Sequence, residues 1–117
     1  MPAATRVPVA ERAVSNVPIR GERRAFNREM LAEVPDMPGV YALWQDEDLI
    51  YFGNAFGGTL SLRTCLAEHV FGVRSMATYM STACAWEVSI APAQREKELL
   101  EEYRAQHGRL PRCNDNG

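Results

Sequence analysis

Two short stretches decide the fold of this chain, Pro38-Gly39-Val40-Tyr41 and Tyr51-Phe52-Gly53, with the acidic Asp46-Glu47-Asp48 between them. Both extend into runs of β-branched, aromatic and other bulky apolar residues, 39–44 and 49–52, which favour strands. The acidic triplet predicts a solvated hairpin loop. Tyr41 and Tyr51 are therefore expected on adjacent antiparallel strands, where opposed and diagonal side chains approach to roughly 5 Å and 7–8 Å. Both phenols could then serve one small site.

Outward from this hairpin, the apolar residues indicate helices and one further strand. Phe26, Met30 and Val34 recur at every fourth position, which predicts a helix over residues 21–34. A helix capped near residues 59–61 should run to about residue 70, and a proline and a glycine should bound another over 92–107. Residues 84–90 alternate as a third strand, and 71–82 should form a loop. We expect an α+β fold, a three-stranded antiparallel sheet flanked by helices, with an N-terminal helix.

Length and composition indicate one domain. With 117 residues, 46% of them hydrophobic, the chain should form a single domain over 21–117, preceded by an irregular segment, 1–20. No apolar run approaches the roughly 20 residues that span a bilayer. The N-terminus lacks the apolar stretch of a signal peptide, so a cytoplasmic protein without membrane contact is expected. The three cysteines are odd in number and widely spaced, which argues against disulfides and zinc sites.

Charge is uneven along the chain. Residues 1–34 contain six arginines and four glutamates, residues 35–117 contain seven basic and eleven acidic residues, and the net charge is −2. The overall field will not attract phosphate, so a nucleic-acid partner would need a local basic patch. The most basic stretch has two interpretations, a solvated helix face or an arm that contacts phosphate. Its candidate residues are Arg20, Arg23, Arg24 and Arg28.

The helix expected over 92–107 carries the most informative carboxylate. At roughly 100° per residue, Glu96 falls on the same face as two leucines and Tyr103, whereas the other three glutamates of this helix fall on the opposite side. A buried carboxylate without a partner is strongly unfavourable. Glu96 should therefore have a partner: Arg63, a tyrosine hydroxyl, a wider hydrogen-bond network, or a metal ion at the edge of the core.

These motifs resemble the GIY-YIG nucleases. The two tripeptides, Gly39-Val40-Tyr41 and Tyr51-Phe52-Gly53, match the pair that names the family, with Gly39 and Gly53 expected as structural turn residues. The order of motifs holds over roughly residues 36–115. The further matches, in chain order, are Arg63 on the following helix, His69 where many members carry a histidine, Glu96 with Leu99-Leu100, and finally Pro111 and Asn114.

The resemblance implies hydrolysis of DNA phosphodiester bonds with a single divalent ion, Mg²⁺ or Mn²⁺, held by Glu96. Arg63 would contact the non-bridging oxygens of the phosphate, and Asn114 would hold Glu96 or the edge of the site. The base that activates water stays open between the two tyrosines and His69. A phenol, with an ordinary pKa near 10, needs a neighbouring cation to act as a base at neutral pH.

Asn54 follows the second tripeptide, where many relatives carry a basic residue, and is a candidate nucleic-acid contact or a turn residue. Three functions are compatible with the sequence. The first is a metal-dependent endonuclease acting on DNA, for which a protein partner could supply target specificity. The second is a catalytically weak or inactive GIY-YIG-like module that binds nucleic acid or protein. The third is an interaction subunit of a larger complex.

Overall fold

The structure is a computed structural model and describes Ile19 and residues 21–114. The segment expected to be irregular, 1–20, lies outside the described residues apart from Ile19, as does the candidate Arg20. Within the described part, no helix is long and apolar enough to cross a membrane. The elements in chain order are β1 (Arg24–Ala25), the 3₁₀ helix η1 (Glu29–Glu33), β2 (Gly39–Gln45), β3 (Asp48–Ala55), α1 (Leu62–Val70), α2 (Met76–Tyr79), β4 (Ala83–Val88) and α3 (Pro92–His107).

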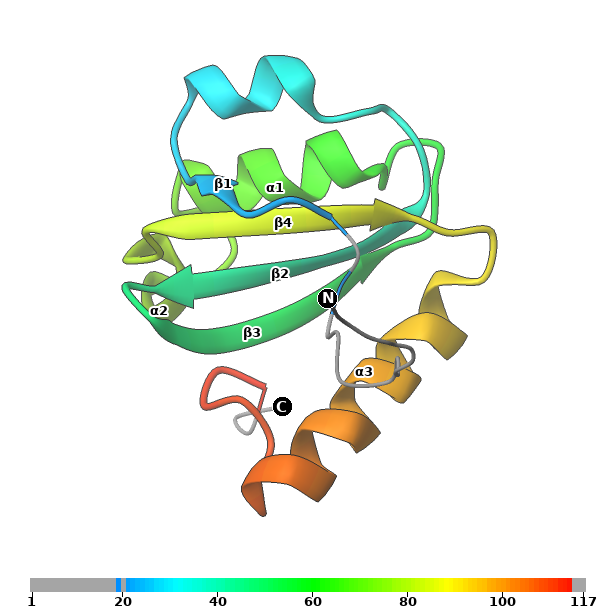
Figure 1. Cartoon of the computed structure of the whole chain (residues 1–117). Coiled ribbons are helices and arrows are strands. Elements are labelled where there is room, and N and C mark those ends of the chain that lie inside the picture. Colours follow the sequence, from blue (N-terminus) through cyan, green and yellow to red (C-terminus); the bar gives the residue numbers. More distant parts are fainter. Residues whose placement is uncertain (1–18, 20, 115–117) are drawn as a thin grey trace, which may run out of the picture.

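The strands form one antiparallel sheet in the order β1-β4-β2-β3 (Figure 1). The expected α+β class is confirmed, and the three long strands are those that the sequence predicts. The sheet has four strands rather than three, because the two-residue β1 pairs with β4. In the β2–β3 hairpin, Asp46 turns the chain with a left-handed φ of 57°, a conformation that aspartate tolerates.

The predicted helix over residues 21–34 is wrong. Residues 24–25 form a strand instead, and helical turns are confined to the five residues of η1. The Asn27 side chain accepts a hydrogen bond from the Met30 amide at 2.9 Å, a local bond that competes with a regular α-helix. The apolar repeat still describes the packing, because Met30 and Val34 are both buried against the sheet.

Two smaller predictions also change, and two are confirmed. The expected loop 71–82 contains the short helix α2, capped by the Ser75 hydroxyl. The third strand ends at Val88, and Ile90 is 99% exposed. The helices α1 and α3 begin and end as predicted: Ser61 caps α1, Pro92 opens α3, and a left-handed glycine ends α3 at residue 108.

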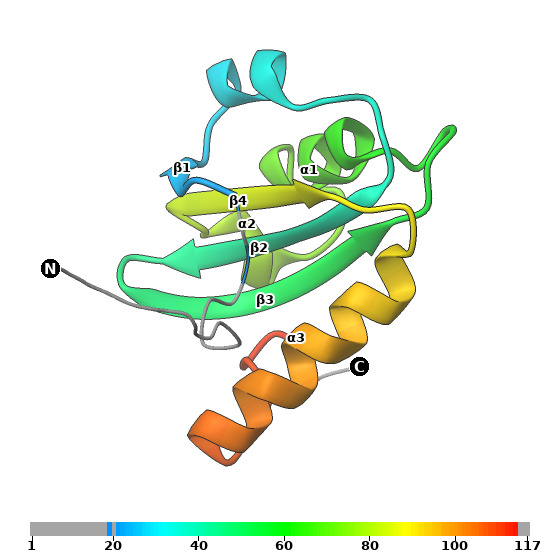
Figure 2. The same ribbon diagram turned by 45° about the vertical axis from the view of Figure 1, so that its right-hand side comes forward.

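The sheet separates two clusters of buried side chains. On one side, which we call the α1 face, α1 and η1 pack against Tyr41, Leu43 and Ile50. On the other, the α3 face, α3 packs against residues that include Val40 and Phe52. Figures 1 and 2 show α1 and α3 on opposite sides of the sheet.

A β-bulge keeps both hairpin tyrosines on the α1 face. Leu43 pairs with Tyr51, but the next residue, Trp44, pairs with Leu49, so β3 contains one extra residue at this point. Strict alternation would place Leu49 on the same side as Tyr51. Because of the bulge, Leu49 packs in the α3-face cluster instead. Tyr51 is thus the diagonal neighbour of Tyr41, and the two lie on adjacent antiparallel strands, as the sequence predicts.

Gly39 and Gly53 lie within strands rather than at turns, which corrects their expected role. A Cβ at position 53 would lie 2.4 Å from Cζ and 2.5 Å from the hydroxyl oxygen of Tyr41, so this ring requires glycine in the neighbouring strand. A Cβ at position 39 would lie 2.2 Å from the Glu87 carbonyl oxygen of β4. Both glycines therefore allow close approach, one of a ring and the other of a backbone.

Candidate functional site at the edge of the sheet

Three rings meet on the α1 face. The centroids of Tyr41 and Tyr51 are 6.1 Å apart, and each lies 5.4 Å from the imidazole of His69. The Tyr41 hydroxyl oxygen is 2.9 Å from Nε2 of His69, and both side chains are buried. Three residues predicted as catalytic, from β2, β3 and the last turn of α1, are thus brought together.

A chain of hydrogen bonds assigns the tautomer of His69. Its Nδ1 lies 2.7 Å from the Thr78 hydroxyl oxygen, and that hydroxyl donates to the Ser75 carbonyl oxygen at 3.3 Å. Because the single hydroxyl hydrogen of Thr78 is used in this way, Nδ1 carries the ring proton and donates it to Thr78. Nε2 is then the acceptor for the hydroxyl hydrogen of Tyr41.

Burial keeps all three rings neutral. Burial, and after it the positive charge of Arg74, lowers the pKa of His69 to about 4. Burial raises the pKa of Tyr41 far above its ordinary value, and the neighbouring Tyr51 raises it further. Tyr51 is half-buried, and its pKa is raised by burial first and by the Glu96 carboxylate second. At neutral pH, His69 is therefore an acceptor and both phenols keep their hydrogens.

Glu96 reaches this edge of the sheet from α3. It is half-buried, and its Oε1 accepts a hydrogen bond from the side-chain amide of Asn54 in β3. Neither Arg63 nor a tyrosine hydroxyl is the partner; Asn54 is, and it lies in a strand rather than a turn. Burial raises the pKa of Glu96, and the hydrogen bond from Asn54 opposes that change. The carboxylate in turn raises the pKa of both phenols.

Arg63 lies outside the ring cluster. It is exposed, and its Nε donates to the Val34 carbonyl oxygen at 2.9 Å. Arg74 lies beside the rings instead, with its Nε donating to Glu68 at 2.9 Å. The sequence analysis missed both Arg74 and Thr78, which follow α1 in a stretch without periodicity. The glycine at 72 followed by a serine cap at 75 was the signal that could have found this turn and helix.

The predicted basic arm makes many of its contacts within the fold. Positive side chains of residues 23–28 lie over aromatic rings, at 4.9–5.8 Å from the ring centroids, and two of them also contact acidic residues. These contacts reduce the charge that the arm can offer to phosphate. The partners are Trp44, Glu47 and the Asp46 carbonyl for Arg23, Trp86, Glu22 and Glu33 for Arg24, and Phe71 for Arg28.

Asn114 holds the outer edge of β3. Its side-chain oxygen accepts from the Phe52 amide and its side-chain nitrogen donates to the Phe52 carbonyl, both at 2.9 Å. The adjacent Cys113 amide donates to the Ile50 carbonyl at 2.9 Å. Two roles were expected for Asn114, holding Glu96 or holding the edge of the site. In the structure its side chain bonds to β3, the strand that carries Tyr51, and not to Glu96.

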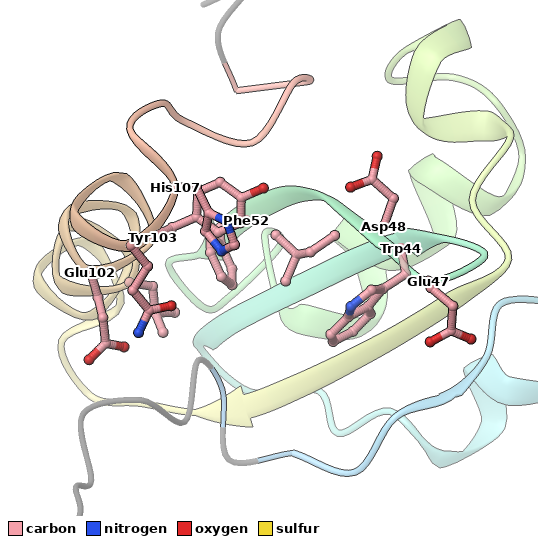
Figure 3. Close-up of a pocket in the computed structure, with 10 residues that line it drawn as sticks. Trp44, Glu47, Asp48, Phe52, Glu102, Tyr103 and His107 are labelled. Carbon is pink, nitrogen blue, oxygen red and sulfur yellow. The ribbon is translucent and has the colours of Figure 1, made fainter.

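A pocket of about 270 Å³ lies on the opposite, α3 face of the sheet. In Figure 3, Trp44, Glu47 and Asp48 of the hairpin lie across the pocket from Tyr103 and His107 of α3. Glu47 and Asp48 have cationic partners from the fold itself, two arginines at 3.5 Å and 2.5 Å. None of the residues predicted as catalytic lines this pocket, so it is separate from the ring cluster.

The chemistry of Glu96 fits a single hard cation. Among the described residues, no three His, Cys, Asp or Glu side chains gather into a metal-binding group. A divalent ion here would therefore depend on Glu96, with waters and a phosphate oxygen completing the octahedral shell that Mg²⁺ prefers. Asn54 holds Oε1, and Oε2 makes no hydrogen bond within the described part of the chain, so this oxygen is suited to a cation.

The hairpin tyrosines and His69 thus meet on the α1 face, and Glu96 and Asn54 meet at the edge strand β3. This arrangement agrees with the order of motifs in the sequence, but it does not identify a family. Comparison with known proteins found that no protein-family model and no curated protein matches the chain.

Proposed function

We propose that the protein is an endonuclease of the GIY-YIG type, which hydrolyses DNA phosphodiester bonds with one divalent ion, Mg²⁺ or Mn²⁺, held by Glu96. The observation that carries this proposal is the buried chain of hydrogen bonds from Tyr41 through His69 to Thr78. Groups whose pKa values are perturbed in this way, next to a half-buried carboxylate, are typical of active sites.

Tyr41 and His69 would act together as the general base. Because burial raises the pKa of Tyr41, a resting phenolate does not form near neutral pH. The attacking water would give its proton to the Tyr41 oxygen while the Tyr41 hydrogen moves to Nε2 of His69. The imidazolium so formed would keep its Nδ1 hydrogen bond to Thr78. Tyr51, the more accessible phenol, would orient the water or the phosphate.

Glu96 and Asn54 would position the cation. The Asn54 amide fixes Oε1 and so restricts the rotation of the carboxylate. A bound divalent ion supplies stabilisation of the negative charge that develops on the phosphate and the leaving oxygen. This arrangement needs only one protein carboxylate, in agreement with the geometry around Glu96.

Nicking of supercoiled plasmid DNA tests this function. The wild-type protein should nick it with Mg²⁺ or Mn²⁺ and stop when a chelator is added. Glu96→Ala should lower the rate about 100-fold or more. Glu101→Ala, on the exposed side of the same helix, is the matched control and should keep the wild-type rate. Robust cleavage by Glu96→Ala would contradict its role, and no cleavage by the wild type with any divalent ion would contradict the nuclease.

One observation favours a second function, binding of nucleic acid without cleavage. Asn54 already occupies Oε1 of Glu96, which leaves one carboxylate oxygen for a catalytic cation. A binding module should give a salt-sensitive gel shift and no product under any metal. The same protein preparation, assayed with and without metal, separates the two functions.

A further inference from the structure

We propose that Arg74, and not Arg63, supplies the guanidinium that contacts the substrate phosphate beside the tyrosine–histidine cluster. This inference rests on the proposed nuclease function and names a further residue of the same site. Three observations support it. The turn at Gly72 brings Arg74 back to α1, the guanidinium of Arg74 is held by residues of that helix, and Arg63 bonds on the opposite side of the helix.

Gly72 reverses the chain at the end of α1. Its φ of 74° is left-handed, which glycine adopts without strain. The amides of Gly72 and Val73 donate back to the carbonyls of His69 and Glu68 at 3.1 Å and 2.9 Å. After this reversal the chain runs back along α1, and the Arg74 side chain contacts Glu68 and Cys65 of that helix. The same segment, continued into α2, delivers Thr78 to His69, so one turn builds two parts of the site.

The guanidinium of Arg74 is held in place and still has donors to offer. Its Nε donates to Glu68 Oε1 at 2.9 Å, and its Nη2 lies 3.6 Å from the sulfur of Cys65. Cys65 lies one turn before His69 on the same side of α1 and belongs to the cluster that contains Tyr41. Nη1 makes no hydrogen bond within the described residues, and the side chain is 38% exposed. A planar fork of this kind matches two phosphate oxygens.

Arg63 points away from this position. On α1 it lies roughly 160° around the helix axis from Cys65, at about 100° per residue. Its Nε is engaged with the Val34 carbonyl at the η1 side of the helix. To reach the rings, Arg63 would have to leave that bond and cross the helix, whereas Arg74 already contacts Cys65 of the cluster that contains Tyr41.

The charge of Arg74 also acts on the rings. Burial is the main cause of the pKa change in Tyr41, Tyr51 and His69, and the Arg74 guanidinium lowers the pKa of each. A cation in this place would draw the negative phosphate toward the phenols and stabilise the charge that develops on it.

A matched pair of variants tests the assignment in the plasmid-nicking assay. Arg74→Gln should lower kcat about 10²- to 10³-fold. Arg63→Gln removes another exposed arginine, from the adjoining helix, and should change kcat by no more than about twofold. Arg74→Lys keeps the charge without the fork and should fall between them. Circular dichroism melting of each variant shows whether the fold is kept, and free guanidinium should restore activity to Arg74→Ala, which a purely structural role would not allow.

Full activity in Arg74→Gln, or a large loss confined to Arg63→Gln, would overturn the inference. If the wild type does not cut DNA in the presence of any divalent ion, the proposed function fails and a binding experiment decides the phosphate contact. In that experiment a thymidine dinucleotide is titrated into the ¹⁵N-labelled protein and the arginine Nε–Hε signals are followed by NMR. A shift at Arg74 and not at Arg63 supports the contact; no shift at Arg74 overturns it.

Discussion

The two faces of the sheet bury their side chains in different ways. The α3 face packs apolar groups of α3, including Leu99, against Val40 and Phe52. The α1 face buries a larger apolar cluster, which also contains the hydrogen-bonded chain of Tyr41, His69 and Thr78. Buried polar groups stabilise a fold only when each is satisfied, and they add little that apolar packing would not. Under the proposed function, the rings of the α1 face take part in the chemistry, and α3 contributes Glu96 at the edge strand.

The largest expected effect tests the α3 face. Leu99→Ala removes a side chain that is 1% exposed and leaves a cavity, so it should lower the free energy of unfolding by about 2–5 kcal/mol. Urea denaturation followed by circular dichroism measures this. Leu60→Ala, at a position that is 42% exposed, is the control and should have a much smaller effect. Equal losses in the two variants would show that the α3 face is not the stabilising core.

A pH titration of stability tests the α1 face. The pKa of His69 is lowered from 6.5 to about 4 in the folded protein. Between these values the unfolded chain takes up a proton that the folded protein does not, so its contribution to stability is present above pH 6.5 and is lost as pH falls toward 4. The loss should be roughly 3 kcal/mol.

His69→Gln removes this proton uptake and should flatten the profile between pH 6.5 and pH 4. His107, exposed at the end of α3, provides the control variant His107→Gln, which should keep the wild-type slope. An unchanged slope in His69→Gln would mean that the imidazole is not held neutral by burial. Urea denaturation at several pH values gives the comparison.

The smallest expected change in stability comes from Tyr41→Phe. It leaves Nε2 of His69 buried without its donor, which should lower the free energy of unfolding by about 1–3 kcal/mol. Tyr103→Phe, on the α3 face, should change it by less than about 0.5 kcal/mol. In the nicking assay the two variants should differ more than in stability, because Tyr41→Phe should abolish activity and Tyr103→Phe should keep it. Loss of activity in Tyr103→Phe would instead join the α3 face to the chemistry.

Much of the fold could be predicted because its signals are local. The hairpin, the serine cap of α1 and the proline and glycine that bound α3 each act within a few residues, and each was found. The N-terminal helix failed because residues 24–25 have a better partner in β4 than in their own chain neighbours. Pairing at the edge of a sheet is decided by tertiary structure, which periodicity does not report.

The candidate site could also be predicted only as far as its signals are local, because the way in which the elements pack decides which side chains meet. At roughly 100° per residue, Arg63 lies at one border of the buried stripe of α1, but a stripe has two borders. Which border faces the tyrosines depends on how α1 packs against β2, and Val34 engages Arg63 on the other one. The position of Arg74 depends on the left-handed turn at Gly72, and the partner of Glu96 depends on which face Asn54 occupies in β3.

The amide of Asn114 has a consequence for self-association. Together with the Cys113 amide it occupies backbone groups of Phe52 and Ile50 on the outermost strand of the sheet. Free groups of this kind are what an exposed border strand offers to a second polypeptide, in domain swapping or in fibril growth. Here a side chain imitates the missing neighbour, so the middle of β3 is closed to pairing with another molecule.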